Sequence, residues 1–170
     1  MVNETQLLPE GSYEPVFVAR QPIFDREQRT WGYELLFRHS DTAVVASFPD
    51  PDEATAKVIA DGYTLAAAGL PVDKRLLINF PRNLLLNDTI YALPPKVCVV
   101  EILETVQPEE AIIQALAAAK KAGFTLALDD FVGQPGFEPF LQLADIVKVE
   151  VLNQSKTDIA RITTMLKQGK

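Results

Sequence analysis

Short apolar runs alternate with helical patterns along most of this chain, and this alternation restricts the possible fold more than any other feature. After the first two predicted strands, the runs are apolar throughout, which is typical of parallel strands covered on both faces. The helices between them are then expected to pack outside the sheet. The predicted strands are 16–24, 31–37, 75–80, 96–103, 124–128 and 146–151, and the predicted helices are 52–68, 83–86, 108–122, 137–143 and 158–166.

Local signals support the ends of several of these elements. The polar stretch 25–29 separates the first two strands and predicts a hairpin, so the first strand is expected to run antiparallel to the second. Asp52 is a suitable N-cap for the first helix. The clearest helix has Pro108 at its predicted first turn, lysines at 120–121 in its last turn and Gly123 after it.

Six strands with interleaved helices form a pattern that resembles a TIM-type (β/α) barrel that stops early. A complete barrel has eight strands in about 250 residues, whereas this chain has 170 residues. We therefore predict a partial or incomplete TIM-type barrel over residues 15–170, preceded by a flexible leader at residues 1–14. Such a chain is either a fragment or a barrel with open edges near Val16 and Val151, and open edges favour a homodimer or a covering domain.

Composition excludes several classes of protein. The net charge is −7, from 16 basic and 23 acidic residues, which disfavours nucleic acid and anionic membranes as partners. Apolar runs are too short to span a bilayer and no export signal is visible, so we predict a cytoplasmic protein. With only one cysteine, Cys98, and one histidine, His39, the chain forms no intramolecular disulfide and no multi-histidine metal site. Phosphate-loop, dinucleotide-fold, serine-hydrolase and zinc-protease motifs are absent from the sequence.

Polar side chains interrupt the predicted strands near their carboxyl ends. These residues are Glu34, Asn79, Glu101 and the pair Asp129 and Asp130. The carboxyl ends of parallel strands meet at one edge of the sheet, and carboxylate and amide oxygens suit Mg²⁺, Mn²⁺ or Ca²⁺. Metal-assisted attack of water on a phosphodiester is a natural reaction for such a site. On these residues alone, however, helix caps and solvated loop positions are the commoner roles, and Asn79 is also a good turn residue.

Two basic residues accompany this acidic set. Lys148 lies within an apolar strand, where an ammonium group is costly unless it is paired. We therefore predict that Lys148 pairs with Asp129 or Glu101. Arg38, just beyond a strand, either contacts a phosphate or pairs with a nearby acid.

Six segments, read in order, resemble the EAL domain, the bacterial family of cyclic di-GMP phosphodiesterases. They are ARQPIFD at 19–25, GYELLFR at 32–38, INF at 78–80, VEILE at 100–104, LDDF at 128–131 and IVKV at 146–149. Glu34 stands at the glutamate of the signature Glu-Ala-Leu. The sequences of the first two segments are most similar to those of degenerate EAL domains that are joined to a C-terminal HDOD domain.

The resemblance implies a role for each matching residue. Metal ligation falls to Glu34, Asn79, Glu101 and Asp129, with Asp130 at a second metal, and the ion is Mg²⁺ or Mn²⁺. Gln21 and Arg38 are expected to touch the dinucleotide, and Lys148 to lie beside the metal ligands.

The sequence also departs from the family pattern. Leu35 and Leu103 replace an alanine and a threonine, and Val132-Gly133-Gln134 stands where Gly-Thr-Gly is expected. The family's later strands, with the lysine that helps to activate water, have no counterpart before Lys170, so no catalytic residue is assigned.

Three hypotheses follow. The first is a degenerate EAL signalling module, catalytically weak or inactive, that acts through protein contacts. The second is a magnesium-dependent phosphodiesterase that cuts cyclic di-GMP to linear pGpG and is represented here by part of a longer chain. The third, a sensor that binds cyclic di-GMP without cutting it, lies between them.

Overall fold

The computed structural model describes residues 17–38 and 51–168, which form six strands and six helical segments. The strands are β1 (Phe17–Phe24), β2 (Thr30–Arg38), β3 (Arg75–Phe80), β4 (Cys98–Ile102), β5 (Thr125–Phe131) and β6 (Ile146–Val149). The α-helices are α1 (Pro51–Ala67), α2 (Arg82–Leu86), α3 (Glu110–Lys121), α4 (Glu138–Leu143) and α5 (Lys156–Gln168), with a 3₁₀ segment η1 at Asp88–Ala92.

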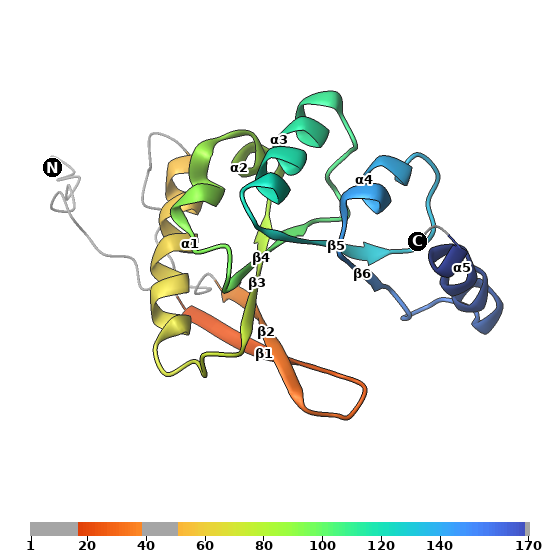
Figure 1. The fold of residues 1–170 in the computed structure, drawn as a ribbon, viewed down its shortest axis with the longest axis horizontal. Helices are drawn as coiled ribbons and strands as arrows, with labels where there is room; N and C mark the ends of the chain where they lie inside the picture. Colours follow the sequence, from red (N-terminus) through yellow and green to blue (C-terminus); the bar gives the residue numbers. More distant parts are fainter. Residues whose placement is uncertain (1–16, 39–50, 169–170) are drawn as a thin grey trace, which may run out of the picture.

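The strands lie in one sheet in the order of the sequence, β1 to β6. β1 pairs antiparallel with β2, and every later pair is parallel. The sheet curves, α1 to α4 are arranged along its outer side, and α5 lies at the end of the molecule opposite α1 (Figure 1). The described strands thus form an arc of a TIM-type barrel that opens with an antiparallel hairpin, as the sequence predicts.

The two faces of the sheet are packed differently. Alternate residues of β3, β4 and β5 face the helices and join the main hydrophobic core, which includes Leu76, Val100 and Leu128. The other face carries a second, smaller cluster of buried side chains. Its members are Leu77, Val99 and Ala127, with Ile23, Trp31 and Ile146 packed against them. Since side chains alternate along a strand, polar residues two positions beyond these apolar ones lie on the same inner face.

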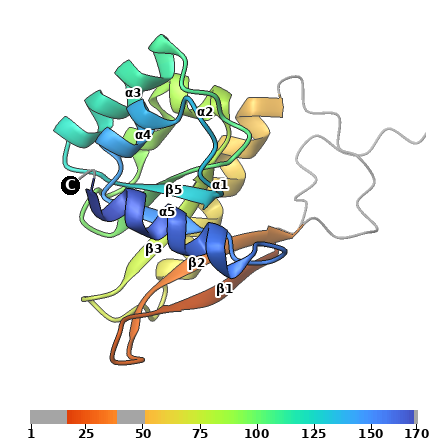
Figure 2. The same ribbon diagram turned by 90° about the vertical axis from the view of Figure 1, so that its right-hand side faces the viewer.

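The β1–β2 hairpin extends beyond the remainder of the sheet (Figures 1 and 2). Its turn is held by Asp25, whose carboxylate accepts hydrogen bonds from the backbone N–H groups of Glu27 and Arg29 at 3.0 and 2.9 Å. A register shift beside Ile23 leaves Trp31 without a direct partner on β1. Next to it, Gly32 is paired so closely with β3 that a Cβ atom there would lie 2.8 Å from the carbonyl oxygen of Arg75.

Several predicted boundaries are wrong by one to three residues. Helix α1 begins at Pro51, so Asp52 lies inside its first turn and is not the N-cap. Helix α3 begins at Glu110, which leaves Pro108 before the helix, and β6 ends two residues before Val151. The end of α3 is as predicted, because Gly123 follows with a φ of +97°.

Some predictions fall outside the described residues. These are the leader at 1–14, the strand edge at Val16 and the residue His39. Among the residues that the structure describes, no helix has the length and apolar character needed to cross a membrane.

Candidate metal centre

Five successive strands each contribute one polar residue to the inner face of the sheet. Strand register places Asn79 of β3 beside Glu101 of β4. Glu34 of β2 is paired with Leu77, two residues before Asn79, and Glu101 is paired with Ala127, two residues before Asp129. Parallel strands end at one edge of the sheet, so this register brings the polar side chains together there.

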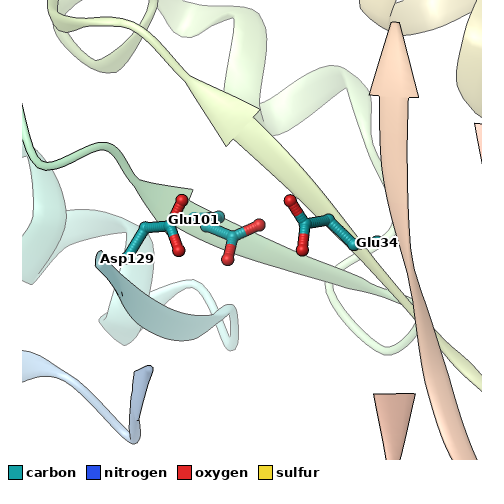
Figure 3. Close-up of side chains that lie close together, drawn as sticks. All are labelled: Glu34, Glu101 and Asp129. Carbon is teal, nitrogen blue, oxygen red and sulfur yellow. The ribbon is translucent and has the colours of Figure 1, made fainter. Parts of the chain in front are cut away.

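Three of the carboxylates converge. Figure 3 shows the side chains of Glu34, Glu101 and Asp129 pointing toward one another from three different strands. One oxygen from each lies within 4.8 Å of the others, a spacing compatible with ligands of one metal ion. The sequence predicts this convergence, and the structure reproduces it for these three residues.

Lys148 of β6 lies at the centre of this group. Its Nζ is 2.9 Å from Glu34 Oε2, 2.6 Å from Glu101 Oε1 and 2.7 Å from Asp129 Oδ1. The predicted pairing with Asp129 or Glu101 is therefore confirmed with both, and Glu34, 114 residues away in the chain, is a third partner. Burial opposes the charge of Lys148, but hydrogen bonds to the three carboxylates outweigh it and raise the pKa above its usual value, so the ammonium form is held.

Glu101 is the most deeply buried member, with 0% of its surface exposed. Burial raises the pKa of its carboxyl from 4.5 to about 7, and the negative charges of Glu34 and Asp129 act in the same direction against the ammonium of Lys148. Three acids share one base here. With all three acids ionised, the group carries two negative charges in excess, and this excess favours the binding of a cation.

Two oxygens in the group have no hydrogen-bond partner among the described residues: Asn79 Oδ1 and Glu101 Oε2. Leaving a buried acceptor unsatisfied costs about 1–3 kcal/mol, and such atoms are found where an ion or ligand completes the site. Both atoms are hard oxygen donors from neighbouring, register-paired residues. The residues present therefore fit a Mg²⁺-, Mn²⁺- or Ca²⁺-type ion.

A second carboxylate group adjoins the first. It joins Asp129 to Asp130 and Glu104, again with one oxygen of each within 4.8 Å of the others. The strand is irregular at this point, since Asp130 has a φ of +41° and the β5–β6 register shifts between Leu128 and Phe131. Consequently the two adjacent aspartates differ in burial, with Asp129 buried and Asp130 exposed. Desolvation of its carboxyl by neighbouring residues, together with the charges of Asp129 and Glu150, raises the pKa of Asp130.

An open hollow of about 570 Å³ lies against this second group. Glu104, Asp130 and Glu150 line it, with Phe137 among its apolar residues. No role for Glu104 or Glu150 is predicted from the sequence. The sequence feature that could have indicated them is their position, because each follows a polar strand residue by two or three places at the same edge of the sheet.

Of the two residues predicted to touch a dinucleotide, the structure describes the side chain of Gln21 but not that of Arg38. Gln21 of β1 is exposed and lies directly opposite Glu34 on β2. Paired residues of antiparallel strands project from the same face, so Gln21 lies on the face that carries the carboxylates. Arg38 is the last residue of β2, and its side chain lies outside the described residues.

Comparison with known proteins identifies relatives in sequence and in fold. No protein-family model matches the chain. It is 37% identical over 144 residues to the cyclic di-GMP phosphodiesterase CdgJ of Vibrio cholerae, a match that covers 84% of this chain and 33% of CdgJ. It is also 34% identical to the uncharacterized protein YuxH of Bacillus subtilis, covering 84% of this chain and 36% of YuxH.

Solved structures share the fold. The Bacillus subtilis YkuI protein, which has an EAL domain and was crystallised with its substrate cyclic di-GMP and calcium, superposes with a TM-score of 0.70 at 20% identity, over 91% of this chain and 46% of YkuI. A standalone EAL protein of Vibrio cholerae in its cyclic di-GMP-bound form gives 0.64 at 23% identity, over 91% of this chain and 76% of that protein. The chain belongs to the EAL domain family. It spans about a third of the length of the curated relatives that it matches.

Proposed function

We propose that this EAL domain is a signalling module that binds cyclic di-GMP at the carboxyl edge of its sheet with the help of a divalent cation. The observation that carries the proposal is the convergence of Glu34, Glu101 and Asp129 on one point, beside unpartnered oxygens of Asn79 and Glu101. The relatives add support, since CdgJ is named for this nucleotide and the YkuI structure contains it together with calcium.

Each residue has a distinct part in this proposal. Glu34, Asn79, Glu101 and Asp129 supply oxygen ligands to Mg²⁺ or Mn²⁺, and Asp130 belongs to a second ion. A bound divalent cation supplies positive charge to phosphate oxygens and lowers the pKa of a bound water. Gln21, exposed on the same face, and Arg38, at the end of β2, contact the nucleotide.

Calorimetric titration of cyclic di-GMP into the protein tests the proposal. We expect binding with Mg²⁺ or Mn²⁺ present, and at least about tenfold weaker binding in EDTA. Glu34→Gln should weaken binding, because it removes one ligand charge without changing side-chain size. Glu27→Gln is the matched control, since Glu27 is an exposed carboxylate on the hairpin. Absence of binding by the unmodified protein with either ion, or equal binding by Glu34→Gln, would contradict the proposal.

A second candidate function is hydrolysis of cyclic di-GMP to linear pGpG, which the 37% identity to a named phosphodiesterase favours. The changed loop at Val132-Gly133-Gln134 favours the first candidate, in which turnover is weak or absent, because hydrolysis depends on accurate positioning of the reacting groups. Chromatography of the nucleotide after incubation with Mg²⁺ or Mn²⁺ separates the two. Nucleotide recovered intact indicates a sensor, whereas pGpG whose formation is lost in Glu34→Gln indicates an enzyme.

A signalling module also needs a partner. We propose that β1 and β6, the edge strands of the described sheet, are covered in a homodimer or by an HDOD-type domain, in a protein that works in the cytoplasm. Analytical ultracentrifugation of the chain at increasing concentration tests the dimer. A sedimentation coefficient that stays at the monomer value up to about 100 μM, where a dimer with a Kd of about 1 μM would be almost fully formed, would contradict the dimer.

A further inference from the structure

The ammonium group of Lys148 contacts one oxygen of each of the three carboxylates to which the proposed function assigns a metal ion. Its Nζ lies 2.6–2.9 Å from one oxygen each of Glu34, Glu101 and Asp129. These carboxylates come from β2, β4 and β5, whereas Lys148 comes from β6. One side chain therefore connects four strands at the carboxyl edge of the sheet.

A divalent cation and this ammonium compete for the same three carboxylates, whereas Asn79 Oδ1 and Glu101 Oε2 have no contact with the lysine. Mg²⁺ binds oxygen at about 2.0–2.1 Å, so an ion held by the three carboxylates would lie in the region that Nζ contacts. Two cations that close repel strongly, most of all where burial excludes water. The side chain of Lys148 is 29% exposed, so part of it already lies at the surface of the protein.

We propose that Lys148 is an internal counter-ion, which holds the three carboxylates together in the metal-free protein and which a divalent cation must displace. This inference rests on the proposed metal site. Without a cation, carboxylates from three strands would repel one another at short range, and the ammonium offsets that repulsion. With a cation, the lysine is a competitor, so it lowers the affinity of the site.

A charge-removing substitution separates this role from a merely structural one. Lys148→Met keeps most of the side-chain volume, and Lys148→Gln keeps a hydrogen-bond donor. Two different replacements are used so that the test still holds when one of them does not fold. Lys121→Met, at the exposed end of α3, is the matched control. Affinity for Mn²⁺ is measured by calorimetry at pH 8, and thermal unfolding is followed in EDTA and in saturating Mn²⁺.

The two readouts should move in opposite directions. We expect Mn²⁺ to bind Lys148→Met and Lys148→Gln about tenfold more tightly or better, because a repelling charge a few ångströms away has been removed. The same variants should melt at lower temperature in EDTA and gain more from Mn²⁺ than the unmodified protein does. A lysine with only a structural role would give weaker binding of Mn²⁺ on substitution.

Unchanged or weaker Mn²⁺ affinity in both Lys148 variants would overturn the inference and leave the proposed function standing, provided that the unmodified protein binds Mn²⁺. If neither the unmodified protein nor any variant binds Mn²⁺, the metal site itself is refuted and the inference falls with it. Tighter binding in Lys121→Met as well would show a general charge effect and would also overturn the role of Lys148.

Discussion

Substitution of Glu101 by glutamine should stabilise the metal-free protein at alkaline pH, although Glu101 contacts Lys148 at 2.6 Å. The folded protein raises the pKa of this carboxyl from 4.5 to about 7. Below pH 4.5 the group is protonated in both states. Between pH 4.5 and 7 the unfolded chain releases the proton while the folded protein keeps it, so the free energy of unfolding falls as the pH rises.

The size of the effect follows from the shift. At about 1.4 kcal/mol for each pH unit, a rise to about 7 corresponds to a loss of about 3 kcal/mol above pH 7. Glutamine has nearly the same shape and carries no charge, so Glu101→Gln avoids this loss. In EDTA, the variant should exceed the unmodified protein by about 3 kcal/mol at pH 8 and by about 1 kcal/mol or less at pH 5.

Urea unfolding followed by circular dichroism, in EDTA at the two pH values, measures these differences. The change in the gap between pH 5 and pH 8 reports on the charge of Glu101 together with its interactions with Lys148, Glu34 and Asp129. Glu27→Gln, on the exposed hairpin, is the control and should change the free energy of unfolding by less than about 0.5 kcal/mol. Saturating Mg²⁺ at pH 8 should stabilise the unmodified protein more than Glu101→Gln. A variant that is less stable at both pH values, with a gap that does not depend on pH, would refute the reasoning.

Two further predictions concern packing. Cys98 is 1% exposed, and burial raises the pKa of its thiol to about 12. We therefore expect a disulfide-exchange reagent to leave the native protein unlabelled at pH 8 and to label it fully in urea. Rapid labelling of the native protein would contradict this burial. Gly32→Ala would place a Cβ 2.8 Å from the carbonyl oxygen of Arg75. In urea titrations it should lower the free energy of unfolding by about 1–3 kcal/mol. A loss below about 0.5 kcal/mol would show that β2 and β3 separate without cost.

The strands and their order are largely predictable from the sequence, because runs such as Val99–Val100 are apolar on both faces and therefore belong inside a layered α/β fold. The helix starts are less predictable. Helix α3 begins after Pro108 because the backbone N–H of Glu109 turns back to the carbonyl of Gln107 at 2.8 Å. The Glu109 side chain meanwhile pairs with Arg82 of α2, at 3.1 Å. A contact between residues so far apart leaves no local signal.

The candidate site likewise has some features that the sequence predicts and others that it does not. Convergence of Glu34, Glu101 and Asp129 follows from the rule that parallel strands end at one edge, and the cost of burying a lysine predicted that Lys148 is paired. The contact between Lys148 and Glu34 was not predictable, because it depends on the curvature that brings β6 towards β2. Likewise, the exposure of Asp130 depends on an irregular strand end that its residue type does not indicate.

Because the carboxylates and the lysine come one from each of several strands, the proposed affinity for a cation depends on the register of the entire sheet. A slip of one residue in any of these strands would turn its polar side chain to the helix-covered side. A misregistered chain would therefore lose the centre altogether, even with its helices intact. Uptake of the proposed ion would accordingly be a stringent assay of native β pairing in this domain, one that circular dichroism does not provide.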